Sequence, residues 1–412
     1  MSDREWKRLD VVRRLERGAL TEAEAGKVLG LSERQVRRLR KAVEQRGSDG
    51  VVHGNTGRPP ANRLSDPQRA KIVRLARKKY VGFNDHHLTE KLVEEEKVAV
   101  SRSSVQRVLR AAGIRAVRRR RPPKHRRRRD RKPQAGLMIL WDGSRHAWLE
   151  ERGPELCLMG SIDDATGELL PGAHFVEQEC AAGYLRVLEA IARKKGLPLS
   201  AYMDRHGSLK RNDDHWTLEE ELRGTQDPTQ VGRALDALDI ERIYALSPQA
   251  KGRVERLWET LQDRLTSELR LAKASTCAQA NAVLERHRPA HNRRFAVEPA
   301  DATPAWRPVR DLDLRRICSF FYAATVLNDN TVRLSGLVID IPPGPRGRSY
   351  AKARVEVRQY LDGSWGVYWH DGPIATAPSS EVCDLRAGRR HKRPVAFRAL
   401  RRGLTRVAAA RP

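Results

Sequence analysis

The stretch SPQAKGRVERLWETLQDRL, residues 247–265, predicts a turn followed by a long helix with a carboxylate near its start. Glu255 is that carboxylate, and it shares a helix face with Glu259 and Gln262. Because the apolar residues occupy another face, Glu255 can point away from the core and into a site. The apolar stripe recurs at helical spacing and consists of Val254, Leu257, Trp258, Leu261, Leu265 and Leu269.

Two apolar runs upstream of this helix also end in carboxylates. LMILWD ends at Asp142 and LPLSAYMD ends at Asp204, and both runs predict strands. A single aspartate at a strand end is more often just solvated, so the three acids count only together and in this order. Hard cations such as Mg²⁺ or Mn²⁺ prefer oxygen ligands, and two of them about 3.5 to 4 Å apart stabilise attacking and leaving oxygens in phosphoryl transfer. Asp142, Asp204 and Glu255 are therefore candidates for holding two such metal ions, and their catalytic role is what the family resemblance described below implies.

The charge of the chain indicates nucleic acid as its partner. The 412 residues carry 80 Lys and Arg against 52 Asp and Glu, a net charge of +28. Such an excess favours double-stranded DNA over the alternative, an anionic membrane. No apolar run approaches the ~20 residues of a membrane-spanning helix, and the start MSDREWKRLD lacks the apolar region of a signal peptide. We expect two to four domains, no membrane partner, and a cytoplasmic, nucleoid-associated protein.

The charge is unevenly distributed along the chain. Residues 115–133 contain twelve Lys and Arg against one acid, and residues 386–412 contain ten against none. Between residues 137 and 300, by contrast, 22 basic residues face 26 acidic ones. The slight acidity of this region is consistent with a carboxylate cluster that binds cations. The two basic flanking segments are expected to bind DNA. The five cysteines are scattered without a CxxC pair, which predicts neither disulfides nor a zinc site.

Residues 1–53 predict a helix-turn-helix unit. TEAEAGKVLG and LSERQVRRLRKAVEQRG form two short helices, with the turn at Gly30 and Ser32 as the N-cap of the second. An ordinary basic helical hairpin is the alternative. The second helix presents side chains suited to base edges and phosphates of a major groove, namely Arg34, Gln35, Arg37, Arg38, Arg40 and Lys41.

A second helix-turn-helix unit is predicted at residues 65–114, after a linker at residues 54–64. In the linker, Arg58 precedes two prolines and is either a minor-groove arm or part of a plain spacer. The second unit has three helical segments, SDPQRAKIVRLARKKY, NDHHLTEKLVEEEKV and SRSSVQRVLRAAGI, the last capped by Ser101. Its outward face is expected to contact DNA through Arg102, Ser103, Gln106, Arg107 and Arg110.

The arginine-rich linker, residues 115–134, cannot fold alone because its like charges repel and it has almost nothing to bury. We expect it to become ordered only on a phosphate backbone, with Arg119 and Arg127 among the contacts. The basic tail, residues 386–412, is expected to behave in the same way. Lys251 and Arg253, at the start of the Glu255 helix, are also expected to bind DNA phosphates.

Residues 135–300 predict a mixed sheet with helices on both faces. Three hairpin-linked strands come first, and helices then alternate with two further strands. The expected strands lie near 137–142, 156–162, 172–178, 199–204 and 241–246, and the expected helices near 182–195, 230–238, 252–269 and 277–291. Residues 315–380 change character to short alternating strands with Asn-Asp-Asn and Asp-Gly turns, which predict a small β-barrel with Trp365, Tyr368 and Trp369 in its core.

The segments WDGSRHAWLEERGPE, SIDDATGELL, YMDRHG, SPQAKGRVERLWETLQDRL and HNRRFAVEP together resemble transposases of the ISNCY insertion-sequence family. The resemblance covers most of residues 20–375. That family belongs to the DDE transposase and retroviral integrase superfamily, so the resemblance implies a ribonuclease H-like catalytic core with Asp142, Asp204 and Glu255 as its triad. The insert KRNDDHWTLEEELRGTQDPTQ adds acids between Asp204 and Glu255, and Glu259 follows one turn later, so the third ligand is the least securely identified. Asp163 and Asp164 are expected to shape a hairpin turn instead.

The resemblance implies an enzyme that binds the terminal inverted repeats of an insertion sequence, cleaves at its ends and joins the 3′-OH ends to target DNA. It also implies a homodimer or larger synaptic assembly, in which we expect the flexible linkers to let one protomer bind the end that another cuts. His206 and Gln249 can assist near the metals or serve structural roles. One alternative is a sequence-specific DNA-binding regulator with an inactive nuclease core. Another, a nuclease for RNA–DNA hybrids, gives no reason for tandem helix-turn-helix units.

Overall fold

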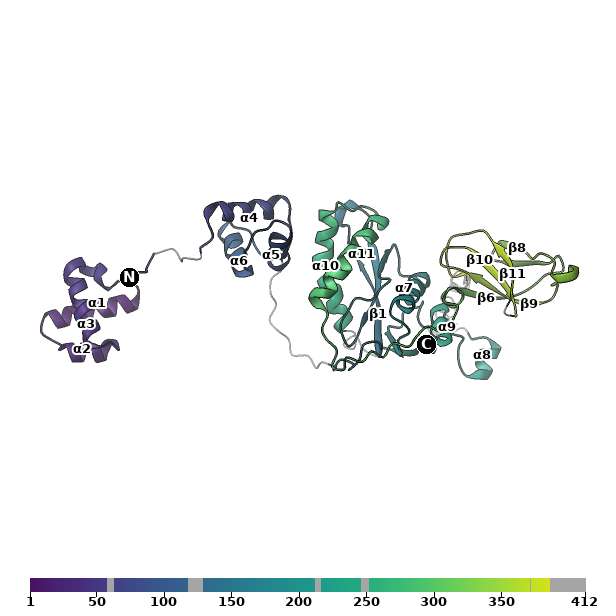
Figure 1. The fold of residues 1–412 in the computed structure, drawn as a ribbon, viewed down its shortest axis with the longest axis horizontal. Helices are drawn as coiled ribbons and strands as arrows, with labels where there is room; N and C mark the ends of the chain where they lie inside the picture. Colours follow the sequence, from purple (N-terminus) through teal and green to yellow (C-terminus); the bar gives the residue numbers. More distant parts are fainter. Residues whose placement is uncertain (58–62, 118–128, 212–215, 246–251, 371, 386–412) are drawn as a thin grey trace, which may run out of the picture. The chain divides into compact units, whose positions relative to one another are not determined.

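The computed structural model describes residues 1–412 except 58–62, 118–128, 212–215, 246–251, 371 and 386–412 (Figure 1). Four predicted DNA contacts, Arg58, Arg119, Arg127 and Lys251, lie outside the described residues, as do Gln249 and the basic tail. The chain divides into two compact units, residues 1–71 and residues 72–412. Each unit is built around its own buried side chains.

The first unit contains the predicted helix-turn-helix and a helix that sequence analysis missed. Helices α2 (Glu22–Leu29) and α3 (Glu33–Arg46) form the predicted pair. Gly30 ends α2 in the left-handed conformation at φ 64°, and Ser32 caps α3 through Gln35 N–H. The unexpected helix is α1 (Asp3–Glu16), whose one apolar face packs against both others. The sequence of α1 is mostly charged, and its apolar face consists only of the buried residues Leu9, Val11, Val12 and Leu15, so the helix was not predicted.

The second helical unit contains the three predicted helices, α4 (Asp66–Lys78), α5 (Asp85–Glu94) and α6 (Arg102–Ala111). Asn84 and Ser101 cap α5 and α6 with side-chain oxygens. Arg110 does not face outward as expected, because its guanidinium donates to Asp85 at 2.5 Å. The partly buried side chain of Arg110 therefore fixes α6 on α5.

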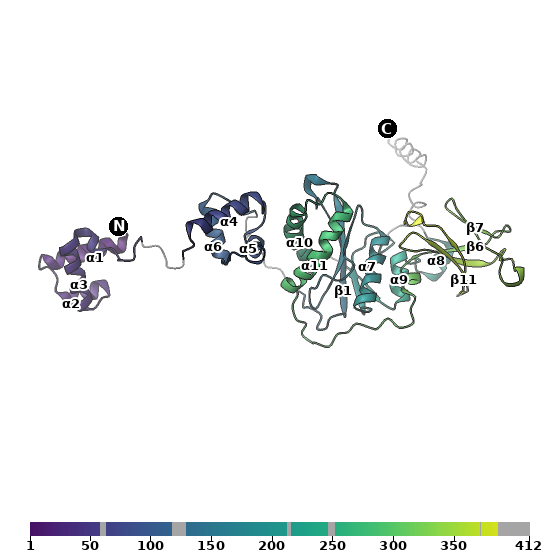
Figure 2. The same cartoon turned by 45° about the horizontal axis from the view of Figure 1, so that its top comes forward.

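A mixed five-stranded sheet in the order β3-β2-β1-β4-β5 confirms the α/β core (Figure 1). β1 pairs antiparallel with β2 and parallel with β4; β2 and β3 are antiparallel, and β4 and β5 parallel. Helices α10 and α11 cover one face and α7 and α9 the other, as Figures 1 and 2 both show. The elements are β1 (Met138–His146), β2 (Leu156–Asp163), β3 (His174–Val176), α7 (Ala181–Lys194), β4 (Ser200–Met203), α8 (Leu218–Arg223), α9 (Gln230–Ala237), β5 (Glu241–Tyr244), α10 (Gly252–Leu271) and α11 (Cys277–Phe295).

Strand β1 is longer than predicted. The sequence placed its end at Asp142, but pairing with β2 continues to His146, opposite Leu156. Polar residues in this extension are tolerated because β2 supplies backbone partners along the whole strand. Asp142 consequently lies in the middle of β1, opposite Gly160.

The C-terminal region is not the predicted β-barrel. Among the described residues it forms a four-stranded sheet, β11-β10-β9-β6, and a separate β7-β8 hairpin, with no strand pairing that closes them. Trp365 is buried as predicted, whereas Tyr368 and Trp369 are only partly buried beneath the guanidinium groups of Arg316 and Arg348. The bounds are α12 (Leu314–Ile317), β6 (Phe320–Thr325), β7 (Thr331–Leu334), β8 (Leu337–Asp340), β9 (Arg354–Gln359), β10 (Trp365–Trp369) and β11 (Gly372–Ala377).

This C-terminal sheet is continuous with the core that also packs α7 and α9. Gln230 on α9 makes a two-way connection, donating to the Phe321 carbonyl at 3.0 Å and accepting from the Phe321 N–H at 2.9 Å. The side chain of Gln230 is buried, so these bonds satisfy both ends of its amide. The two sheets therefore share one folded unit.

Candidate active site

Asp142 lies on β1, and Asp204 directly follows the last residue of β4, the parallel neighbour of β1. The register pairs Met138 with Ser200 and Leu140 with Tyr202, so two further residues bring Asp204 beside Asp142. Side chains alternate along a strand, and Leu140 and Tyr202 pack into the core beneath α10. Asp142 therefore points to the face of the sheet that α10 covers.

Helix α10 contacts this level through Trp258. The indole Nε1 donates to Asp142 Oδ2 at 2.9 Å, and one turn later Gln262 Nε2 donates to Ser144 Oγ at 3.2 Å. Gly160, opposite Asp142, makes room for this contact, because a Cβ there would lie 3.3 Å from the Trp258 ring. The predicted apolar stripe of α10 is buried at every position.

Glu255 lies one turn before Trp258 and is exposed, whereas Val254 and Leu257 beside it are buried. The expectation that Glu255 points away from the core is therefore confirmed. Glu259, which directly follows Trp258 and lies one turn after Glu255, is also exposed. The sequence of α10 thus offers two exposed candidates for the third carboxylate near Trp258.

The donor set suits a hard cation, since it offers only carboxylate oxygens from three separate elements. Within the described ranges, however, no group of three His, Cys, Asp or Glu side chains lies close enough to hold a metal ion. One oxygen of Asp142 accepts from Trp258, and Oδ1 of Asp204 accepts from the His206 backbone N–H at 2.9 Å. In the part of the chain that the structure describes, the three carboxylates do not form a ready coordination shell.

A fourth carboxylate, Glu179, lies in this region and was missed by sequence analysis. Its Oε1 accepts from the Tyr184 hydroxyl at 2.5 Å and lies 3.4 Å from His206 Nδ1. Its Oε2 closely approaches Gly143, where an added Cβ would stand only 2.7 Å away. Glu179 lies in the segment between β3 and α7. It approaches Gly143, next to Asp142, and His206, two residues after Asp204. Nothing in the local sequence distinguishes Glu179 from exposed Glu177. The tertiary fold is what brings Glu179 close to the neighbours of the two aspartates.

Negative charge in this region also affects two groups that lie beneath it. Burial, with the nearby charges of Glu179 and Asp142, raises the pKa of the Cys157 thiol to about 12. Burial and the charges of Glu179, Asp204 and Asp142 likewise raise the pKa of Tyr184 well above its usual value. Both groups stay protonated near neutral pH, so the carboxylates supply the charge of the site.

Asp163 and Asp164 confirm the predicted turn, and Asp164 has a further role. Asp163 accepts from the backbone and hydroxyl of Thr166, which closes the turn after β2. Asp164 is fully buried and pairs with Arg129 and with Arg253, each at 2.6 Å. The end of the arginine-rich linker is thus ordered on protein, contrary to the expectation that only phosphate could order it. In this arrangement Arg253 pairs with a carboxylate at the position where we expected it to bind phosphate.

The other predicted DNA contacts are displayed on two helices. On α3, the side chain of Gln35 accepts from the Ser32 N–H in a capping box, and Arg37 pairs with Glu22 at 3.1 Å. Apart from Arg110, the predicted contacts on these two helices are exposed: Arg34, Gln35, Arg37, Arg38, Arg40, Lys41, Arg102, Ser103, Gln106 and Arg107.

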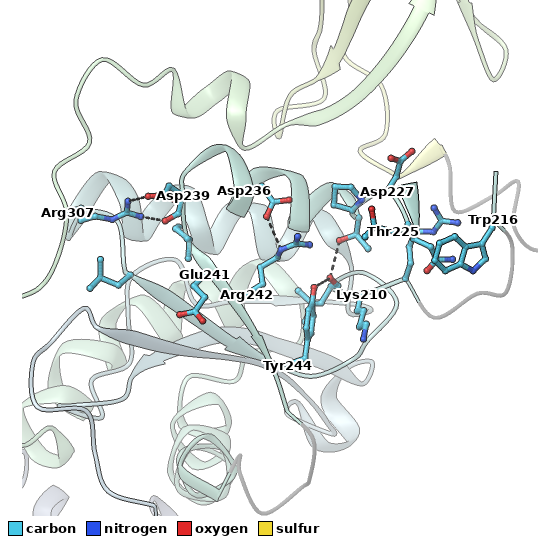
Figure 3. Close-up of a pocket in the computed structure, with 18 residues that line it drawn as sticks. Lys210, Trp216, Thr225, Asp227, Asp236, Asp239, Glu241, Arg242, Tyr244 and Arg307 are labelled. Carbon is cyan, nitrogen blue, oxygen red and sulfur yellow. Dashed lines mark hydrogen bonds and ion pairs between the residues drawn. The ribbon is translucent and has the colours of Figure 1, made fainter. Parts of the chain in front are cut away.

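A cavity of about 1090 Å³ lies elsewhere, lined by α9, by β5 and by the segments on either side of α8 (Figure 3). None of the three predicted catalytic residues lines it. Its arginines are engaged with acids, Arg242 with Asp236 and Arg307 with Asp239, as the dashed lines show. The insert after Asp204 contributes Trp216 and Asp227 to this cavity, away from the two aspartates.

Comparison with known proteins identifies the class to which this fold and site belong. Residues 8–70 match the family described as winged helix-turn helix. The chain is 35% identical over 376 residues to "Putative transposase y4bF" of Sinorhizobium fredii, covering 90% of this chain and 79% of that protein. It is 32% identical over 337 residues to "Transposase for insertion sequence IS1202" of Streptococcus pneumoniae, covering 71% and 68% respectively. The chain belongs to the transposase family, and it is a DNA-binding polynucleotidyl transferase.

Two solved structures are also similar to the chain. One belongs to the simian T-cell lymphotropic virus intasome, with 12% identity and a TM-score of 0.30, covering 75% of this chain and 100% of that chain. The other is the HTLV-2 integrase catalytic core domain in complex with magnesium, with 16% identity and a TM-score of 0.23, covering 37% and 85%. Among the described residues, no helix is long and apolar enough to cross a membrane.

Proposed function

We propose that the protein is a DDE transposase of the ISNCY family that binds terminal inverted repeats, cleaves DNA at the element ends and joins the 3′-OH ends to target DNA. Asp142, Asp204 and Glu255 are its catalytic carboxylates. The observation that supports this most directly is that Asp142 on β1 and Asp204 just after β4 lie on neighbouring parallel strands or their ends, while Trp258 connects Asp142 to the helix that carries Glu255. We place this activity in the cytoplasm, at the nucleoid.

The chemistry follows from the charge of the site. Two Mg²⁺ or Mn²⁺ ions, when bound, stabilise the attacking and leaving oxygens of an in-line displacement. The carboxylates of the three residues would hold these ions, and Trp258 orients Asp142 by donating to one of its oxygens. Glu179 restrains Tyr184 and the His206 turn that follows Asp204. Exposed arginines on α3 and α6 supply the contacts to base edges and phosphates.

Alanine at the catalytic positions provides the test. We expect Asp142→Ala, Asp204→Ala or Glu255→Ala to lower divalent-dependent nicking of end-containing DNA by at least about a hundredfold, since each removes a metal ligand. Binding of the same DNA in a mobility-shift assay should change little, because the predicted binding residues lie on other helices.

Glu259→Ala is the matched control, as an exposed carboxylate one turn away on the same helix. Wild-type nicking by all three variants would contradict the active site. If Glu259→Ala abolished nicking and Glu255→Ala did not, the third ligand would be Glu259. A wild-type protein that binds ends but never nicks them would favour the regulator with an inactive core.

Concerted cutting of two ends requires at least two active sites, so we also propose a dimer or larger assembly on paired ends. Shared DNA would hold the assembly together. Light scattering of the protein with and without paired end DNA measures this directly. A single protomer on each isolated end, with no paired complex at any ratio, would contradict it.

A further inference from the structure

The second helical unit touches the catalytic core through a row of charged side chains. Glu90 on α5 accepts from both guanidinium nitrogens of Arg264 on α10, at 2.6 and 3.0 Å. One turn along α10, Glu268 accepts from Lys91 at 2.8 Å and lies 2.7 Å from His87 Nε2. These five side chains, from α5 and α10, form what we call the α5 interface.

Further contacts extend the α5 interface at both ends. Arg294 on α11 pairs with Glu94 at 2.5 Å and with Glu90 at 3.4 Å. In the turn before α5, Asn84 donates to Asp263 and the Val81 carbonyl accepts from Arg270. About two turns of α10, from Asp263 to Arg270, therefore take part, which no isolated surface ion pair would require.

Burial distinguishes these pairs from ordinary surface charges. The side chains of His87, Arg264 and Lys91 are 3%, 9% and 14% exposed. Arg264 also lies over the Phe295 ring, 4.8 Å from its centroid. Burial alone would raise the pKa of Glu268, but hydrogen bonds from His87 and Lys91 outweigh it and hold the pKa at about 2. The charged side chains of α5 are thus paired with opposite charges on the helices that face it.

We infer that residues 72–114 are a fixed part of the catalytic body, so that the duplex bound by α6 is presented to the active site of the same chain. The inference rests on the proposed function and goes beyond it by assigning the DNA contacts of α6 and the cleavage step to one protomer. Although the sequence predicts a freely tethered second unit, α5 joins this unit to α10, the helix that carries Glu255.

The position of α6 supports this arrangement. A groove of about 800 Å³ is lined by Arg102 and Gln106 of α6 and by Glu259 and Thr260 of α10. The predicted base-reading side chains therefore lie across a groove from the turn of α10 that follows Glu255. A duplex held by α6 passes next to that end of α10 without any rearrangement.

The first experiment measures docking without measuring activity. The full-length chain, carrying a specific protease site at residues 121–126, is cut, and co-elution of its two fragments is followed by gel filtration at low salt. We expect the fragments to co-elute, and Arg264→Glu or Glu90→Arg to weaken their association by about tenfold or more. The double charge swap should restore it, which shows that the single variants fail through pairing. Lys194→Glu, an exposed charge reversal on α7 at the opposite face of the sheet, is the matched control.

Separation of the wild-type fragments at low salt would overturn the inference, and so would equal co-elution of the single reversals and the control. Because this readout involves no cleavage of DNA, it remains decisive even if the proposed function fails.

The second experiment asks which chain cuts the bound end. Arg102→Ala/Gln106→Ala protein is mixed with Asp142→Ala protein on end-containing DNA. We expect no more nicking than either variant gives alone, since α6 and the catalytic carboxylates must act in one chain. Nicking restored by mixing would overturn the inference and leave the proposed transposase activity intact.

Discussion

At the scale of single residues, the hydrogen bond from Trp258 to Asp142 is the clearest link between the two parts of the site. Asp142 and Asp204 could be predicted from the sequence because each follows an apolar run. Trp258 could be predicted only as a core residue, since its spacing shows which face it occupies and not which atom its N–H meets. Glu179 could not be predicted at all, because its neighbours Gly143 and His206 come from β1 and from the turn after β4.

Glu179→Gln tests whether this fourth carboxylate positions the site. The substitution keeps the shape and removes the charge that faces Tyr184 and His206. We expect the nicking rate to fall about 10- to 100-fold while DNA affinity stays unchanged, as for other residues that orient metal ligands. The measurement is the nicking rate at saturating divalent metal, compared with the metal concentration needed for half-maximal rate.

Glu177→Gln is the control, since Glu177 is exposed two residues earlier. If Glu179→Gln matched this control in both nicking rate and metal dependence, Glu179 would have no role in positioning the site.

At the scale of elements, the helices and the sheet followed from periodicity, and the exceptions have identifiable causes. Helix α10 was predictable because six apolar residues repeat at helical spacing. The extension of β1 to His146 was not, because it depends on pairing with β2. The predicted barrel was wrong for a related reason, since alternation identifies strands but cannot say whether their sheets close.

Helix α11 carries a buried histidine that should make stability depend on pH. His291 is 2% exposed, and its Nδ1 has no hydrogen-bond partner among the described residues. Burial, with the charges of His287, Arg264 and Arg294, lowers the pKa of His291 to about 3. An unfolded chain binds this proton near pH 6.5 and the folded chain does not, so stability falls as pH drops from 6.5 towards 3.

We expect this residue to cost about 2 kcal/mol of unfolding free energy between pH 6.5 and 5. Urea unfolding followed by tryptophan fluorescence measures it, and His291→Phe should flatten the slope in this range. His287, whose pKa burial lowers to about 4, leaves a residual slope. His370→Gln, at an exposed position, should leave the slope unchanged. An equal slope in wild type and His291→Phe would contradict this assignment.

At the scale of the whole molecule, the sequence predicted separate units joined by linkers, but it could not show which of them dock. The partners of the charged residues on α5 lie on α10, more than 170 residues away in the chain. Likewise, Arg129 read as a phosphate contact until the fold placed it on buried Asp164. The charge of a segment predicts that it binds a group of opposite charge. Only the tertiary structure shows which group that is.

The central claim is that Asp142 is a metal ligand in a site that cuts DNA, and metal substitution tests it most directly. Asp142→Cys places a thiolate, which suits softer metals than Mg²⁺, where the carboxylate stands. We predict that this variant scarcely nicks end-containing DNA in Mg²⁺ and recovers substantial nicking in Mn²⁺, while Asp142→Ala stays inactive in both. Wild-type nicking by Asp142→Cys in Mg²⁺, or the same residual rate for both variants in both metals, would contradict the claim.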